Sequence, residues 1–314
     1  MSTFSHETAP TEFVKSNGIQ IAYRRFGKRG GRPLVFLQYL TAGLDDWDPL
    51  VTNGLALDHD VVLVNNVGVA SSSGETPNTI DQMAKDTSGF CDAMGFKEID
   101  VVGFSIGGMV AQQLALDRPN LLHRIILWGT GPRGGEGMTF PELSEKDKID
   151  PVVFLLAAFF TPTEASQSAG KAFVERMAWR REDRDKPVSK QTEDAQIMAL
   201  RTWGTVPSSG RYQTLNKIKQ KTLIIPGENC SRRKQLEGFP LRIGLSMRTV
   251  IDTHDRSGDK LTKVSTSQAA YSTPIYSDEW SSANELMQSL VSTNLQALSS
   301  LADPPLAAQK NPHE

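Results

Sequence analysis

The feature that most constrains the fold of this chain is the glycine-rich segment Gly103-Phe104-Ser105-Ile106-Gly107-Gly108. It follows the β-branched run Ile99-Asp100-Val101-Val102, which predicts a buried strand. It precedes residues 109–116, which are apolar at helical spacing and end close to Pro119, so they predict a helix. A Gly-x-Ser-x-Gly pentapeptide between a strand and a helix is typical of a nucleophile elbow, in which a tight turn exposes the serine hydroxyl. The sequence therefore predicts that Ser105 is a nucleophile.

Alternating strand and helix signals surround this segment. Runs that are apolar on both faces predict buried strands at 34–37 and 61–64, and 125–128 and 221–225 are predicted to be further buried strands. An amphipathic stretch closed by Gly95 predicts a helix over 80–94. Asn17-Gly18 between two alternating segments predicts a β-hairpin near the start of the chain. This alternation indicates an α/β fold with a doubly wound, mostly parallel sheet.

The strand rhythm stops between about residues 141 and 212, where helical signals take over. Thr161-Pro162-Thr163-Glu164 predicts a helix with Thr161 as its N-cap, and Ser189 predicts the start of another. The charged cluster 180–186 is interpreted as a solvated loop. A helical insertion between two sheet strands predicts a lid over the carboxyl ends of the strands, where such sheets bind ligands.

These signals predict four regions. Residues 1–140 are expected to form the N-terminal part of the core and 141–215 the helical lid. Residues 216–260 are expected to form an atypical C-terminal part of the core, and 261–314 a poorly ordered tail with a single candidate helix.

Composition excludes several classes of function. A net charge of −2 lacks the basic field of a nucleic-acid-binding protein. Two cysteines, Cys91 and Cys230, are too few for a disulfide framework and fit a reducing compartment. Residues 1–10 lack the apolar core of a signal peptide, and the longest apolar run, 151–160, is too short to span a membrane and predicts a buried helix. We expect a cytoplasmic protein without nucleic-acid or membrane partners, and the composition is compatible with a homodimer.

From Phe13 to Glu228 the chain resembles the α/β-hydrolase fold, in the subgroup of single-domain esterase, lactonase and haloperoxidase-like enzymes. The resemblance rests on four stretches: the elbow at 103–108, the lead-in at 37–40 with Asp45-Asp46-Trp47-Asp48-Pro49, the loop at 66–72, and 224–229.

The resemblance implies roles for three residues. Ser105 is similar to the family nucleophile, and the backbone N–H groups of Ile106 and Leu40 would form the oxyanion hole. Gln38-Tyr39 stands where the family commonly has His-Gly, which alters the shape and polarity of that hole.

The chain departs from the family pattern after the expected strand at 221–225. Family members commonly read Gly-Glu-Asn-Asp there, with the aspartate as the triad acid, whereas this chain has Cys230. A thiol cannot orient an imidazole and stabilise its charged form as a carboxylate does. Three acids remain open for this role: Glu228, Glu136 after the preceding strand, and Asp255.

His254 is the candidate general base. It lies 24 residues after Cys230, near the acid-to-base interval of the family, and follows 248–252, a candidate eighth strand. The alternatives are that His254 is a surface histidine in a charged loop, or that the segment after Asn229 is not a working hydrolase terminus. The remaining histidines are poorer candidates because they lie at strand entries or near the termini: His6, His59, His123 and His313.

The sequence after Cys230 also loses its periodic apolar pattern. Residues 231–278 are rich in Ser, Thr and charged side chains, which predicts the least ordered part of the molecule and the first site of limited proteolysis. The leucine spacing over 285–301 predicts one amphipathic helix.

The sequence thus predicts a serine hydrolase that acts on a carboxylic ester or lactone of a small hydrophobic molecule. Ser105 would attack the carbonyl carbon, the amides of Leu40 and Ile106 would stabilise the oxyanion, and His254 would carry the proton. No metal, nucleotide or flavin cofactor is implied. Residues 66–70 have spaced small side chains but lack the Gly-x-Gly-x-x-Gly spacing of a dinucleotide loop. The alternative is a non-catalytic relative that binds a small hydrophobic ligand under the lid.

Overall fold

The computed structural model of the 314-residue chain describes residues 4–135, 138 and 150–225. All of them belong to the first of the two units into which the chain divides, Met1–Thr266. The expected region boundaries near 140 and 260, the candidate strand at 248–252, the Ser/Thr-rich stretch 231–278 and the candidate helix at 285–301 lie outside the described residues. Those expectations remain predictions.

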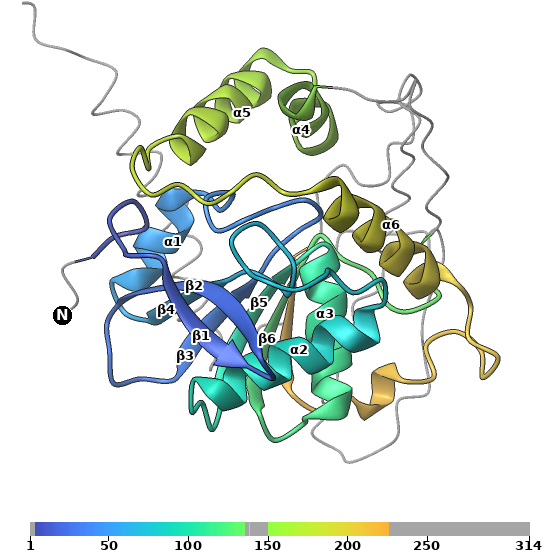
Figure 1. Cartoon of the computed structure of the whole chain (residues 1–314). Coiled ribbons are helices and arrows are strands. Elements are labelled where there is room, and N and C mark those ends of the chain that lie inside the picture. Colours follow the sequence, from blue (N-terminus) through green and yellow to red (C-terminus); the bar gives the residue numbers. More distant parts are fainter. Residues whose placement is uncertain (1–3, 136–137, 139–149, 226–314) are drawn as a thin grey trace, which may run out of the picture. The chain divides into compact units, whose positions relative to one another are not determined.

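A seven-stranded sheet forms the centre of the described part (Figure 1). The strands lie in the order β1-β2-β4-β3-β5-β6-β7. β2 is antiparallel to both of its neighbours, and all the other pairs are parallel. The mostly parallel sheet predicted from the sequence is confirmed. Its strands are β1 (Glu12–Ser16), β2 (Ile19–Gly27), β3 (Pro33–Leu37), β4 (Asp60–Val64), β5 (Ile99–Phe104), β6 (Leu122–Trp128) and β7 (Lys221–Ile225).

The hairpin between β1 and β2 follows from its two turn residues. Asn17 and Gly18 both have positive φ, 49° and 84°. This is the pattern of a type I′ turn, whose twist matches that of two antiparallel strands. Ser16 therefore pairs directly with Ile19, as the Asn-Gly signal predicts.

Three helices flank the sheet: α1 (Pro49–Ala56), α2 (Ile80–Ala93) and α3 (Ile106–Asp117) (Figure 1). The side chains of Asp48 and Thr79 cap α1 and α2, whereas α3 has no side-chain cap. An uncapped helix start leaves backbone N–H groups available to another acceptor.

The core lies where α2 and α3 pack on each other and on the sheet. β3 and β4 are buried along their whole length, as expected for central parallel strands. Burying one such side chain contributes about 1.5–3 kcal/mol to the free energy of folding. Because α3 packs on this core and on β5, the connection between β5 and α3 is held in place. The core includes Val35, Leu37, Val62, Val101, Met109, Val110 and Leu114.

Further helices lie in the chain between β6 and β7, as the loss of strand rhythm predicts. They are α4 (Pro151–Phe159), α5 (Glu164–Met177), α6 (Lys190–Gly204) and the short 3-10 helix η2 (Leu215–Lys217). The predicted helix start at Ser189 is confirmed: Ser189 is the N-cap of α6, and its hydroxyl accepts the N–H of Thr192. The predicted N-cap Thr161 is wrong: the α5 cap is Thr163, whose hydroxyl lies 3.3 Å from the N–H of Ser166.

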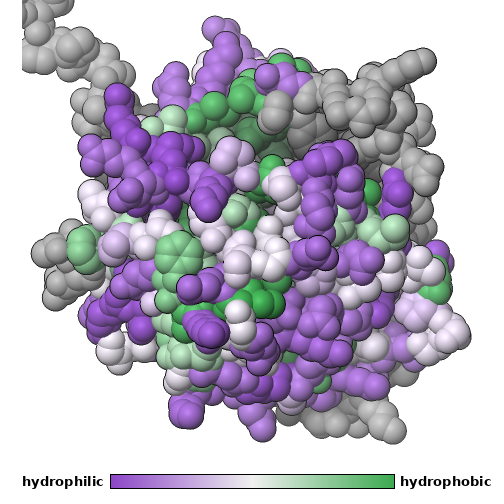
Figure 2. All heavy atoms as spheres, viewed as in Figure 1, coloured by the Kyte–Doolittle hydropathy of each residue, from purple (hydrophilic) through white to green (hydrophobic). Residues whose placement is uncertain are grey.

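Two segments predicted to be buried are partly exposed. α4 packs against α5. This packing leaves three of its apolar side chains partly exposed: Val152 by 42%, Val153 by 50% and Phe159 by 45%. Figure 2 shows an apolar region over α4 and α5 on a mainly hydrophilic face. β7 is half-buried because it borders the described sheet and pairs on one side with β6. None of the described helices is long and apolar enough to span a bilayer.

The charged cluster 180–186 is only in part the solvated loop that its composition predicts, because residues 181–184 and 186 are exposed whereas Arg180 and Asp185 bind other parts of the fold. Arg180 is only 4% exposed, and its guanidinium donates to the carbonyl oxygens of Glu7 at 2.9 Å and Ala9 at 2.8 Å. Asp45 accepts hydrogen bonds from the fully buried Arg24 and from the backbone N–H of Asp185. The composition misleads here because these charges are paired with the core rather than with water.

Candidate active site

Ser105 lies on the sharp turn between β5 and α3. Its backbone has φ 53° and ψ −116°, a conformation that non-glycine residues rarely adopt. Its N–H donates to the carbonyl of Trp128 at 2.9 Å, and its carbonyl accepts from Gly108 at 3.0 Å and Met109 at 3.3 Å. The backbone is therefore fixed on both sides, and the half-buried Ser105 side chain makes no capping hydrogen bond to α3. This is the backbone geometry of a nucleophile elbow.

The glycines of the elbow are required by close backbone approach. A Cβ atom on Gly103 would lie 2.5 Å from the carbonyl oxygen of Gly107. A Cβ atom on Gly107 would collide with the carbonyl oxygens of Leu37 and Gln38. The first turn of α3 thus lies directly against the chain that leaves β3.

The loop after β3 brings Leu40 to the same edge of the sheet as Ser105. β3 and β5 are parallel neighbours, and the strand order changes direction between them, which is where open α/β sheets bind ligands. Leu40 is half-buried against the core. Within the described part of the chain, the backbone N–H groups of Leu40 and Ile106 have no hydrogen-bond acceptor.

An aromatic cluster borders the elbow. Phe104 directly precedes Ser105. The centroid of its ring lies 5.2 Å from the ring centroid of Tyr39, 5.2 Å from that of Trp128 and 5.6 Å from that of Phe159 on α4. Burial raises the pKa of Tyr39 well above its ordinary value, so its phenol stays neutral. Its hydroxyl donates to the carbonyl of Asp46 at 3.0 Å. The cluster that begins at Phe104 is therefore aromatic and carries no charge on Tyr39.

Buried polar atoms without a hydrogen-bond partner also gather around the elbow. In the described residues these include Gln38 Oε1, Trp47 Nε1 and Thr130 Oγ1. Gln38 adjoins the first turn of α3, Trp47 packs against Phe104, and Thr130 lies where a side chain on Gly108 would have to go. Unpaired buried polar groups are uncommon, and they concentrate at functional sites.

The predicted base and acids lie outside the described residues. This applies to His254, Glu136, Glu228 and Asp255, and also to Cys230. The structure therefore brings together Ser105, Leu40 and Ile106 of the predicted site and leaves the other roles as predictions.

The described histidines lie away from this edge. His123 is at the amino-terminal end of β6 and pairs with Asp100 at 2.9 Å, and His59 directly precedes β4. His6 is buried against Thr52, and burial lowers its pKa from 6.5 to about 4. The described residues contain no cluster of His, Cys, Asp or Glu that could hold a metal ion.

The insertion reaches the loop that carries Leu40. Gln196 on α6 is 2% exposed, and its Oε1 accepts the backbone N–H of Thr41 at 2.7 Å. The two residues are 155 positions apart, and no sequence motif marks Gln196. Only the packed structure identifies this contact.

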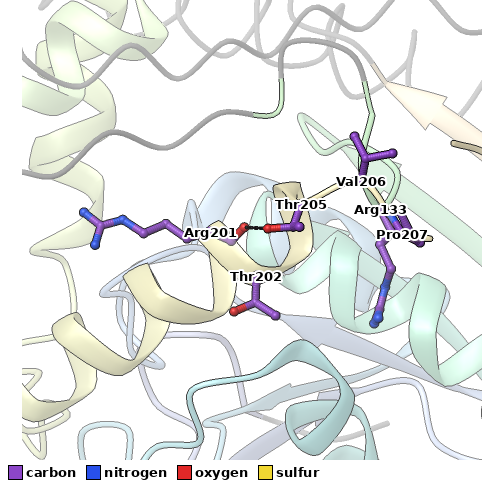
Figure 3. Close-up of a pocket in the computed structure, with 6 residues that line it drawn as sticks. All are labelled: Arg133, Arg201, Thr202, Thr205, Val206 and Pro207. Atoms are coloured by element: carbon purple, nitrogen blue, oxygen red, sulfur yellow. Dashed lines mark hydrogen bonds between the residues drawn. The ribbon is translucent and has the colours of Figure 1, made fainter. Parts of the chain in front are cut away.

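A cavity of about 360 Å³ lies at the carboxyl end of α6 (Figure 3). Arg133 and Arg201 line it, but in Figure 3 the Arg201 side chain extends to the left and the Arg133 side chain downward, so their guanidinium groups do not converge on one ligand. The side chain of Arg133 is bound to Asp81 at 2.6 Å and lies over the ring of Trp203. None of the residues of the elbow lines this cavity.

Comparison with known proteins agrees with this geometry. A family model described as the alpha/beta hydrolase fold matches residues 32–229. The structure of an alpha/beta hydrolase fold protein from Chitinophaga pinensis is 33% identical, with a TM-score of 0.64, over 71% of this chain and 91% of that one. The chain belongs to the alpha/beta hydrolase fold family.

Curated relatives match over shorter stretches. The dihydrolipoyllysine-residue acetyltransferase component of an acetoin cleaving system from Cupriavidus necator is 32% identical over 48% of this chain and 41% of its own length. The 3-oxoadipate enol-lactonase 2 of Acinetobacter baylyi is 25% identical over 48% of this chain and 57% of its own length. The matched part thus spans about half the length of these relatives.

Proposed function

We propose that this protein is a serine hydrolase that cleaves a carboxylic ester or lactone of a small hydrophobic molecule. The observation that carries the proposal is the strained backbone of Ser105 at the uncapped start of α3, beside two backbone N–H groups without a described acceptor. Strain of this kind persists where the surrounding structure enforces it, and it concentrates at active sites. The enol-lactonase among the relatives supports this class of substrate.

In this mechanism the Ser105 oxygen attacks the substrate carbonyl carbon while its proton passes to a base. The carbonyl oxygen becomes an oxyanion, which the N–H groups of Leu40 and Ile106 and the positive end of the α3 dipole stabilise. The tetrahedral intermediate then releases the alcohol, which takes the proton from the base, and leaves an acyl-serine. Water hydrolyses the acyl-serine by the same steps in reverse order. With a lactone, the alcohol remains part of the opened product.

His254 is proposed as the base, and the acid remains open among Glu228, Glu136 and Asp255. The aromatic rings of Tyr39 and Phe104 beside Ser105 favour an apolar group on the substrate. We further propose that the insertion between β6 and β7 covers this substrate as a lid, because the α4 ring of Phe159 contacts Phe104.

A specific observation favours a second candidate function. Cys230 stands where the family commonly has the triad acid, which is compatible with a non-catalytic relative that binds a small hydrophobic ligand at the same place. Such a protein would retain Ser105 without activating it.

A fluorophosphonate probe separates the two functions, since it reacts at an appreciable rate only with an activated serine. We expect the purified protein to be labelled, with the adduct on Ser105 by peptide mass spectrometry, and to hydrolyse short-chain aryl esters. A folded protein that is neither labelled nor active would favour the ligand-binding function. An adduct on another serine would remove Ser105 as the nucleophile.

A further inference from the structure

The turn that carries Leu40 contains a strained residue. The N–H of Ala42 donates to the carbonyl of Tyr39 at 3.3 Å and closes a four-residue turn with Leu40 and Thr41 at its centre. Thr41 has φ 58°, whereas Leu40 is not among the residues with positive φ. Negative φ followed by positive φ is the pattern of a type II turn, whose third position favours glycine or asparagine. A β-branched threonine at this position is a genuine outlier, so another contact must hold it there.

Gln196 supplies that contact. Its Oε1 accepts the N–H of Thr41 at 2.7 Å, while the Thr41 hydroxyl donates to the carbonyl of Leu40 at 2.7 Å. Both polar groups of the Leu40–Thr41 peptide are thus engaged, and the peptide cannot rotate without breaking both bonds. Gln196 itself is held, because it is 2% exposed and flanked on α6 by the buried Ala195 and Ala199.

The peptide between the two central residues is the unit that differs between turn types. In the commoner type I turn it is rotated by about half a turn, and the third residue has negative φ. Without an acceptor for its N–H, Thr41 would lose the contact that opposes this rotation. This rotation would change ψ of Leu40 and so shift the 39–42 turn. The Leu40 N–H, one of the two proposed oxyanion donors, belongs to the preceding Tyr39–Leu40 peptide of that same turn. A donor must lie within about 0.5 Å of its working position to act fully.

We propose that Gln196 is a positioning residue for the oxyanion hole: its amide oxygen holds the Leu40–Thr41 peptide in the orientation that places the Leu40 N–H for catalysis. The inference rests on the proposed function. If Gln196 has this role, α6 is part of the catalytic geometry and does more than cover the substrate. The oxyanion hole is then complete only when α6 is packed against the 39–42 turn. A transition-state role of this kind lowers turnover more than substrate binding when it is lost.

Gln196→Ala tests the proposal, with Gln191→Ala as a matched control. Gln191 is on the same helix and also bonds the core backbone, through the N–H of Thr76 at 3.2 Å and its carbonyl at 3.1 Å, but not the turn of Leu40. We expect Gln196→Ala to lower kcat for an aryl ester by about tenfold or more with little change in KM, and to slow fluorophosphonate labelling equally. Gln191→Ala should lower the thermal midpoint and leave kcat unchanged.

Thr41→Gly in the Gln196→Ala background separates positioning from general loosening of the structure. Glycine adopts positive φ without steric cost, so the double variant should regain turnover although the hydrogen bond is still absent. Unchanged kcat and labelling in Gln196→Ala would overturn the inference alone. A loss of turnover that Thr41→Gly does not restore would also overturn it. A wild-type protein that is neither labelled nor active would overturn the proposed function, and this inference with it.

Discussion

The carboxylate of Asp185 accepts a hydrogen bond at 2.9 Å from the backbone N–H of Leu44, across 141 residues of chain. The same carboxylate accepts from the side chain of Asn65 at 2.7 Å and from the N–H of Ser71 at 3.1 Å. One side chain between α5 and α6 thus joins the loops that follow β3 and β4. The insertion is anchored at the edge of the sheet where Ser105 lies.

Asp185→Ala should destabilise the protein by about 2 kcal/mol or more, because it leaves partly buried N–H groups without an acceptor. Urea unfolding measures the loss. Glu182→Ala is the control, since Glu182 is exposed in the same segment and its substitution should change stability by less than about 0.5 kcal/mol. Equal stability of the two variants would contradict the anchoring role.

Two buried groups should give opposite pH dependences of stability. Burial lowers the pKa of His6 from 6.5 to about 4, so the unfolded chain binds a proton first and stability falls as pH drops from 6.5 to 4. Burial raises the pKa of Asp46 from 3.8 to about 6, so the folded protein retains its proton and stability falls as pH rises from 4 to 6. Each effect is on the order of 3 kcal/mol, and the two oppose each other in the same window.

Single variants should separate these two effects in urea unfolding between pH 4 and 6.5. Asp46→Asn should gain stability relative to the wild type as pH rises, because the wild type must ionise a buried carboxyl. His6→Asn should gain stability relative to the wild type as pH falls. In the wild type, the unfolded chain binds a proton at His6 that the folded protein does not bind, and this favours unfolding; the variant lacks the effect. A pH-independent difference from the wild type in either variant would show that the group does not titrate as described.

Ser105→Gly should be more stable than Ser105→Ala by about 1–2 kcal/mol, because only glycine adopts φ 53° without steric strain. Both variants should lose fluorophosphonate labelling and ester hydrolysis. Ala111→Gly in the interior of α3 is the control and should destabilise, since φ is helical there. Thermal unfolding of the three variants checks the order. Retained turnover in Ser105→Ala would eliminate the elbow as the active site.

His254→Ala should lower turnover by roughly 10³-fold without affecting folding, because Ser105 would lose its proton acceptor. Wild-type activity should also fall as pH drops through the imidazole pKa, ordinarily about 6.5. His123→Ala is the control. His123 pairs with Asp100 at the amino-terminal ends of β5 and β6, away from Ser105, so kcat should not change. Full activity of His254→Ala would assign the base elsewhere.

Local patterns in the sequence were sufficient for the sheet and the elbow. The strands at 34–37 and 61–64 are apolar on both faces, and Asn17-Gly18 fixes a hairpin by its own backbone preference. Gly103, Ser105 and Gly107 identify the elbow because their chemistry and spacing are confined to a single turn. Signals of this kind need no knowledge of distant partners.

Tertiary structure alone decided which polar side chains hold the site together. Arg180 and Asp185 belong to a segment whose composition is typical of a solvated loop, yet they bind the core. A charged side chain can be buried only where a partner compensates for its lost hydration, and these partners are distant in the sequence. Gln196 reaches Thr41 across 155 residues, a distance over which sequence periodicity carries no information. The local elbow could be predicted from the sequence, whereas the contacts that fix its surroundings depend on which helices pack against the carboxyl edge of the sheet.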